Sequence, residues 1–186
     1  IRLSVLTLWR DKGLLFFLLA AAVMGEAAQS ATVFLAPLQY ERACIPASLY
    51  GALFALTQAA GLAAAASGRI IATYGRRCAF VSLVAIMAAS LAALAVSGSA
   101  FVSITALIVL TAAAAAFRPL STTVQNEKAH DSSRATMLSV NAIVMELMAA
   151  IMNTGVGYAS ALGLPIGFGA LAMMVAALLL LTRSIF

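Results

Sequence analysis

The feature that most constrains this chain is a series of six long apolar segments separated by short polar links. The segments comprise residues 13–38, 48–73, 78–96, 101–120, 135–161 and 164–181. Each is close to the roughly 20 residues that a helix needs to cross a bilayer. Strand periodicity is absent, and a backbone in lipid must satisfy its own hydrogen bonds. The sequence therefore predicts an all-α integral membrane protein, a bundle of six transmembrane helices.

Composition supports this assignment. Charged residues make up 9% of the chain and hydrophobic residues 64%, whereas a soluble domain is about a quarter charged. The predicted solvent is therefore the lipid bilayer. The chain begins at Ile1, with no basic segment and cleavage site around the first apolar stretch, so this stretch reads as a span and not as a signal peptide. We expect the chain to be a fragment or a processed product.

Basic residues orient the predicted bundle, because lysine and arginine are held on the cytoplasmic side. Both chain ends and the links after the second and fourth segments fall on one side. That side holds all the basic residues except one: Arg2, Arg10, Lys12, Arg69, Arg76, Arg77, Arg118, Lys128, Arg134 and Arg183. The other side holds Arg42. We therefore expect cytoplasmic termini in a bacterial inner (plasma) membrane, and no nucleic-acid partner.

The sequence predicts no metal, no cofactor and no enzymatic activity. Cys44 and Cys78 fall on opposite sides of a membrane about 30 Å thick, too far apart for a disulfide. His130 is the single histidine and lies in a polar link, which excludes a zinc or bis-histidine haem site. Hydrolase, metalloprotease and nucleotide motifs are absent from the sequence. An intramembrane enzyme with a carboxylate pair stays open as one alternative.

Two carboxyl groups fall near the middle of apolar segments. Glu26 lies in the first segment and Glu146 in the fifth. An ionised side chain at that depth costs a few kcal/mol, so each carboxyl is expected to be protonated, to find a partner or to face a water-filled cavity. No cation is expected near either. Gln29 and Ser30 follow Glu26 at positions i+3 and i+4, on the same helix face.

A second polar line is predicted on the fifth segment. Ser139, Glu146 and Asn153 follow one another at seven-residue intervals. Such residues can bond helix to helix, or they can line a translocation cavity. We predict a cavity for proton coupling or substrate, lined by Glu26, Glu146, Gln29, Gln58, Ser139 and Asn153.

Polarity also divides the chain into two units. The third and sixth segments are the least polar, as expected of two three-helix repeats whose first two members line a central path. The repeats would comprise residues 13–97 and 100–182. Residues 1–12 would be a cytoplasmic lead-in and residues 183–186 a tail.

The link after the second segment carries a motif. Residues 68–77 read GRIIATYGRR and resemble the signature G-x-x-x-D-[RK]-x-G-[RK]-[RK] of the major facilitator superfamily. The matching residues are Gly68, Gly75, Arg76 and Arg77. Ala72 and Thr73 depart from the pattern, so the acidic residue that helps to latch the two halves of the family's fold is missing.

Residues 38–48 and 134–139 also resemble the link before the eighth helix and the start of the eleventh helix of this superfamily. The resemblance implies the C-terminal half, helices seven to twelve, of a transporter that works by alternating access. We therefore predict proton-coupled secondary transport of a small solute. The missing N-terminal half or a second copy would be the partner. A non-transporting assembly or receptor-like module is the other alternative.

Overall fold

A computed structural model describes residues 12–128 and 134–182, and every regular element in this part of the chain is helical. The elements are α2 (Lys12–Gln29), the π-helix η1 (Ser30–Leu35), α3 (Ala36–Arg42), the 3-10 helix η2 (Ala47–Leu49), α4 (Tyr50–Ala59), the 3-10 helix η3 (Ala60–Ala66), α5 (Ser67–Val96), α6 (Ala100–Lys128), α7 (Arg134–Leu162) and α8 (Leu164–Thr182). The all-α prediction is confirmed for these residues. The interpretations of Arg2, Arg10, His130 and Arg183 lie outside them.

Five helical runs are long and apolar enough to cross a membrane. They are Phe16–Arg42, Ala47–Ala65, Ile71–Val96, Ala100–Thr123 and Ala142–Leu162. The apolar part of α8, Leu164–Leu180, is shorter than these. The described structure is thus that of a multi-pass membrane protein with five candidate spans.

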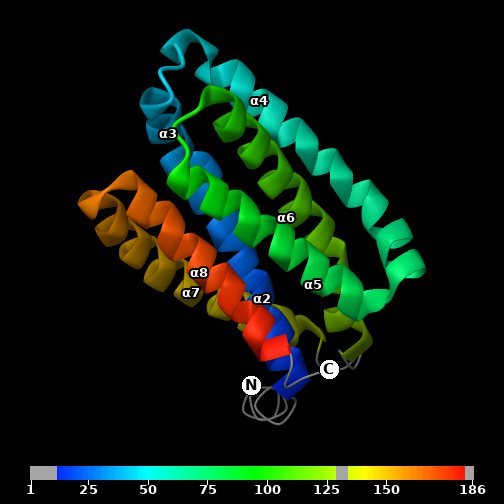
Figure 1. Cartoon of the computed structure of the whole chain (residues 1–186). Coiled ribbons are helices and arrows are strands. Elements are labelled where there is room, and N and C mark those ends of the chain that lie inside the picture. The colour runs from blue at the N-terminus through cyan, green and yellow to red at the C-terminus, as the bar shows by residue number, and fades with distance from the viewer. Residues whose placement is uncertain (1–11, 129–133, 183–186) are drawn as a thin grey trace.

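The helices run up and down the bundle. The start of α2 and the end of α8 lie at one end, which we call the Lys12 end (Figure 1). The opposite end, where α3 meets the turn into α4, is the Arg42 end. The described basic residues apart from Arg42 lie on helix segments at or near the Lys12 end. Which of the two ends faces the cytoplasm stays a prediction.

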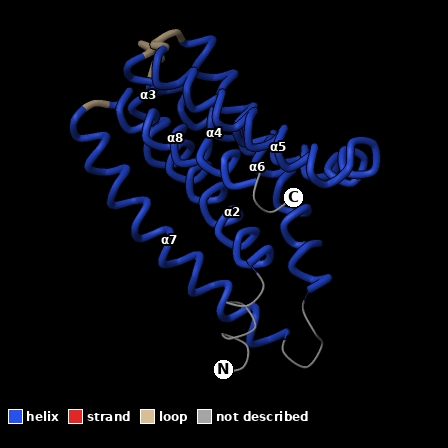
Figure 2. The backbone as a smooth tube through the Cα atoms, turned by 60° about the horizontal axis from the view of Figure 1, so that its bottom comes forward, coloured by secondary structure: helices blue, strands red, loops and turns tan. Residues whose placement is uncertain are grey.

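Four helices form the centre and two lie at the margins. α5 packs on α6 and α8, and α2 packs on α6 and α7. Figure 1 shows α4 and α7 along opposite margins of the bundle, and the turned view of Figure 2 again places α7 on the outside. α4 and α7 bury the smallest share of their residues among the candidate spans.

An aromatic cluster joins three of the central helices near the Lys12 end. The fully buried ring of Phe80 on α5 lies 5.7 Å from the ring of Phe16 and 5.6 Å from that of Phe17, both on α2. It also lies 5.6 Å from the ring of Phe117 on α6, in an edge-on arrangement. Edge-on aromatic pairs add stability beyond the area they bury.

Replacing Phe80 by alanine is expected to destabilise the protein by about 3–5 kcal/mol, because the ring is removed from a packed site and leaves a cavity. Equilibrium unfolding in mixed micelles would measure the loss. Val81→Ala is the matched control, because the neighbouring side chain is exposed and its truncation should cost no more than about 0.5 kcal/mol. Equal losses for the two variants would contradict this assignment of the core.

The first helical run corrects a predicted boundary. The sequence placed its end at Leu38, near Pro37, but the helix continues to Arg42. Pro37 has no N–H for the carbonyl four residues earlier and crowds it, which normally breaks or kinks a helix. Here the chain widens into the π-helix η1 immediately before α3. The change in winding accommodates the proline and lets the helix go on.

The turn between the second and third segments follows the prediction. Gly75 has φ +77° and ψ 162° and interrupts α5 between Ser67 and Val96. Only glycine adopts such a conformation without strain. The glycine of the signature-like segment therefore makes the tight turn expected of it, and Arg76 and Arg77 follow at the Lys12 end, on exposed positions.

Polar side chains close the Arg42 end. Arg42 Nη1 donates to the carbonyl oxygen of Ala95, in the last turn of α5, at 3.3 Å. Gln39 Nε2 donates to the carbonyl oxygen of Ser97 at 2.7 Å and to Ser103 Oγ at 2.9 Å. A cation and amide donors at a helix C-terminus satisfy carbonyls that lack helical partners. The one arginine predicted for this side therefore has a structural role.

Candidate functional site

Three polar side chains meet between the first helical run and α7. Ser30 Oγ donates to Asn153 Oδ1 at 2.7 Å. Asn153 Nδ2 faces Glu26 Oε2 at 3.5 Å, which is long for a hydrogen bond. Ser30 is buried, whereas Glu26 and Asn153 are half-buried. The predicted polar lines of the two helices thus meet at these residues.

The cluster lies at mid-depth in both spans. Glu26 comes ten residues after the start of the span Phe16–Arg42, about 15 Å along the helix. Asn153 comes 11 residues after the start of Ala142–Leu162, about 16 Å along it. Glu26 and Ser30 are one turn apart on one face, so both reach the same asparagine. A polar group at this depth has no bulk water to satisfy it.

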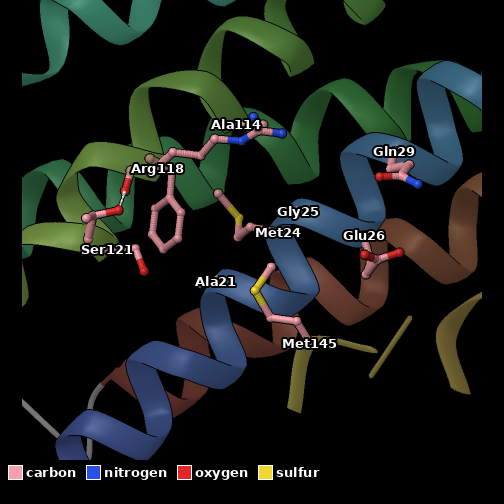
Figure 3. Close-up of a pocket in the computed structure, with 11 residues that line it drawn as sticks. Ala21, Met24, Gly25, Glu26, Gln29, Ala114, Arg118, Ser121 and Met145 are labelled. Carbon is pink, nitrogen blue, oxygen red and sulfur yellow. Dashed lines mark hydrogen bonds between the residues drawn. The ribbon is translucent and has the colours of Figure 1, made fainter. Parts of the chain in front are cut away.

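A cavity of about 280 Å³ adjoins Glu26. Three helices line it, α2, α6 and α7 (Figure 3). Its lining residues are Ala21, Met24, Gly25, Glu26, Gln29, Ala114, Phe117, Arg118, Ser121, Thr122 and Met145. Of the predicted site residues, Glu26 and Gln29 line this cavity, and Asn153 contacts Glu26 next to it.

We expected no cation near Glu26, and the structure places Arg118 in the lining of the same cavity. It sits within the span Ala100–Thr123, five residues before that span ends, and it lines the same cavity. In Figure 3 its side chain extends along α6 in the direction of the part of α2 that carries Glu26 and Gln29. Arg118 and Glu26 do not form an ion pair with each other in the described structure.

The sequence contained a signal for Arg118. Ala114, Arg118 and Thr122 follow one another at four-residue intervals, so they share one face of α6. All three line the cavity. An arginine that falls inside an apolar segment, on a face with a small residue and a hydroxyl, indicates an internal polar surface. We counted Arg118 only among the basic residues of the cytoplasmic side and therefore did not assign it to an internal polar surface.

The cavity wall combines two kinds of surface. Met24, Phe117 and Met145 provide apolar contact, and each comes from a different helix. A carboxyl, an amide, a guanidinium and two hydroxyls supply the polar groups. Apolar walls with a few placed polar groups are typical of small-molecule sites. Chemically, the arrangement suits binding of a small charged or polar solute.

Three predicted site residues lie elsewhere. Gln58 is exposed on α4, and Ser139 and Glu146 are exposed on α7. On α7, the residue that lines the cavity is Met145, next to Glu146. The residues of the signature-like segment lie at the Lys12 end of the bundle, outside the cavity lining.

Comparison of the chain with models of protein families, with curated proteins and with solved structures finds no match. The functional interpretation therefore depends on the geometry of the cavity and on the residues that line it.

Proposed function

We propose that this chain is one six-helix half of a secondary transporter that moves a small solute by alternating access, with Glu26 as the proton-carrying group. The observation that carries the proposal is a carboxyl at mid-depth of a membrane span, bordering a cavity and touching Asn153 of another helix. Intramembrane acidic residues that face a cavity are characteristic of proton and substrate pathways.

Protonation would change what Glu26 requires from its surroundings. An ionised carboxylate at this depth needs water or a cation, whereas the neutral acid is satisfied by hydrogen bonds. Within the apolar spans of α6, α7 and α8, the helices packed against α2, the charged residues are Arg118 and Glu146. Uptake of a proton would therefore permit the cavity to close, and release would favour an open, wet cavity.

Three observations support a sixth crossing and a half-transporter. The start of α2 and the end of α8 lie at the same end of the bundle, as an even number of crossings requires. The apolar part of α8, Leu164–Leu180, is about 25 Å long as a helix, close to the thickness of the hydrocarbon core. The sparsely buried helices α4 and α7 offer surfaces for a second half, and exposed Gln58 and Glu146 lie on them.

Flux measurements test the proposal. The protein, in its complete natural form, would be reconstituted into vesicles with an imposed pH gradient and offered a panel of labelled small solutes. Accumulation of a solute that collapses when a protonophore removes the gradient supports proton-coupled transport. Specific binding without flux would instead favour a receptor-like module, and chemical conversion of the solute would favour an intramembrane enzyme.

The proposed topology predicts which positions a membrane-impermeant thiol reagent reaches from outside the cell. In a background lacking Cys44 and Cys78, cysteines at exposed Ser99 and Ala161 should be labelled in intact cells, because both lie at the Arg42 end. A cysteine at exposed Tyr74 is the control from the Lys12 end and should react only after the membrane is breached. The reverse pattern would overturn the orientation.

A further inference from the structure

We propose that the cavity next to Glu26 takes a small zwitterion of the amino-acid type, with its ammonium group at Glu26 and its carboxylate at Arg118. This inference rests on the proposed function for its statement that the solute is carried. It goes beyond that function by naming the chemical class of the solute and by assigning Arg118 to the site.

The two opposite charges in the cavity carry the inference. Glu26 and Arg118 come from different helices and line one cavity without an ion pair between them. Within residues 12–128 and 134–182, the Glu26 carboxylate has one hydrogen-bond contact, the long one from Asn153. Glu26 is half-buried, and a partly buried charge without a full set of partners is costly. Arg118 is exposed where it lines the cavity. A solute that carries both charges can make a charge-assisted contact with each residue, whereas a solute with one charge can make only one such contact.

The size and wall of the cavity limit the solute further. A volume of about 280 Å³ lies just below the usual range for ligand pockets, so the solute is small. Met24, Phe117 and Met145 would contact an aliphatic or thioether side chain. The planar guanidinium of Arg118 suits a carboxylate in particular, because it can donate two parallel hydrogen bonds.

Binding to the purified chain in lipid nanodiscs tests the charge requirement without any need for flux. The probes are leucine, 3-methylbutan-1-amine, which lacks its carboxylate, and 4-methylpentanoate, which lacks its ammonium. Isothermal titration should show leucine binding at least about tenfold more tightly than either analogue, because each analogue loses one charge-assisted contact. Equal affinity for an analogue, or no binding of all three probes, would overturn the inference.

Variants of Glu26 and Arg118 should show which residue binds which charged group of the solute. Glu26→Gln should weaken leucine binding at least about tenfold and leave 4-methylpentanoate nearly unchanged. Arg118→Gln should also weaken leucine binding, but it should leave the binding of 3-methylbutan-1-amine nearly unchanged. Glu41→Gln and Arg69→Gln are the matched controls, since these exposed residues lie outside the cavity, and they should bind leucine as the unmodified chain does.

Glu26→Asp is the control for misfolding. It keeps the charge and should retain selectivity for leucine at reduced affinity. Equal weakening of all three probes by Glu26→Gln and Arg118→Gln would contradict the assignment. The outcome is separable from the proposed function. If the protein binds leucine selectively but supports no flux, the transport proposal is refuted and the zwitterion site stands. If the protein carries a solute that lacks one of the two charges, the zwitterion site is refuted and the transport proposal stands.

Discussion

Replacing Glu26 by glutamine is expected to abolish proton-driven accumulation while leaving the protein folded. One coupled proton and a gradient of one pH unit supply about 1.4 kcal/mol, enough for about tenfold accumulation. In the variant the ratio of internal to external solute should fall to about one. Glutamine keeps the size of the side chain and an oxygen that accepts the contact from Asn153 Nδ2, but it takes up no proton.

The test is radiolabelled uptake into vesicles that contain the complete protein, measured with and without the pH gradient. Glu26→Asp should keep part of the accumulation, because it still titrates from a position one methylene shorter. Glu41→Gln, at an exposed site outside the cavity, should behave as the unmodified protein. Accumulation by Glu26→Gln with unchanged dependence on pH would show that the residue is a structural hydrogen-bonding group.

Glu146 shows where helix periodicity ceases to be informative. Ser139, Glu146 and Asn153 share a helix face by spacing, yet Asn153 contacts Glu26 whereas Ser139 and Glu146 are exposed. Spacing fixes which residues share a face. What lies opposite that face changes along a helix, because neighbouring helices cross it at an angle. The pairing of α7 with α2 at one level therefore could not be predicted from either helix alone.

The end of the third segment and both ends of the fifth were more predictable, whereas α6 continues to Lys128, beyond the end predicted at Leu120. The fifth segment was placed at residues 135–161, and α7 runs from Arg134 to Leu162. The third was placed at residues 78–96, and α5 ends at Val96. In lipid, backbone hydrogen bonding leaves helices as the economical structure and membrane thickness sets their length. Local winding was not predictable in this way, as the π-helix before Pro37 shows.

Arg118 illustrates a second limit of the sequence. Charge counting assigns an arginine to one side of the membrane and says nothing of where a long side chain ends. The backbone of Arg118 lies near the end of its span, yet the residue lines a cavity with Glu26, which lies at mid-depth in another helix. The shared cavity depends on the packing of α6 against α2. The spacing of residues within either segment does not predict this packing.

A single copy of this chain is expected to accumulate no solute, because alternating access needs two bodies that move against each other around the site. The cavity is lined by α2, α6 and α7 of one bundle, while α4 and α7 leave most of their surface uncovered. A second half, or a second copy, would have to cover these helices to form the opposite wall. Without it, Glu26 faces a cavity with no moving counterpart.

Vesicles holding single chains would test this requirement. Stepwise photobleaching of a label at exposed Ser99 would count the copies in each vesicle, and uptake would be measured under a pH gradient. Vesicles with one copy should accumulate no more solute than protein-free vesicles. If two copies form the transporter, accumulation should appear in vesicles with two or more copies and rise more steeply than the mean copy number. Proton-driven accumulation in vesicles with one copy would contradict the half-transporter proposal, because a single bundle would then contain both walls of the pathway.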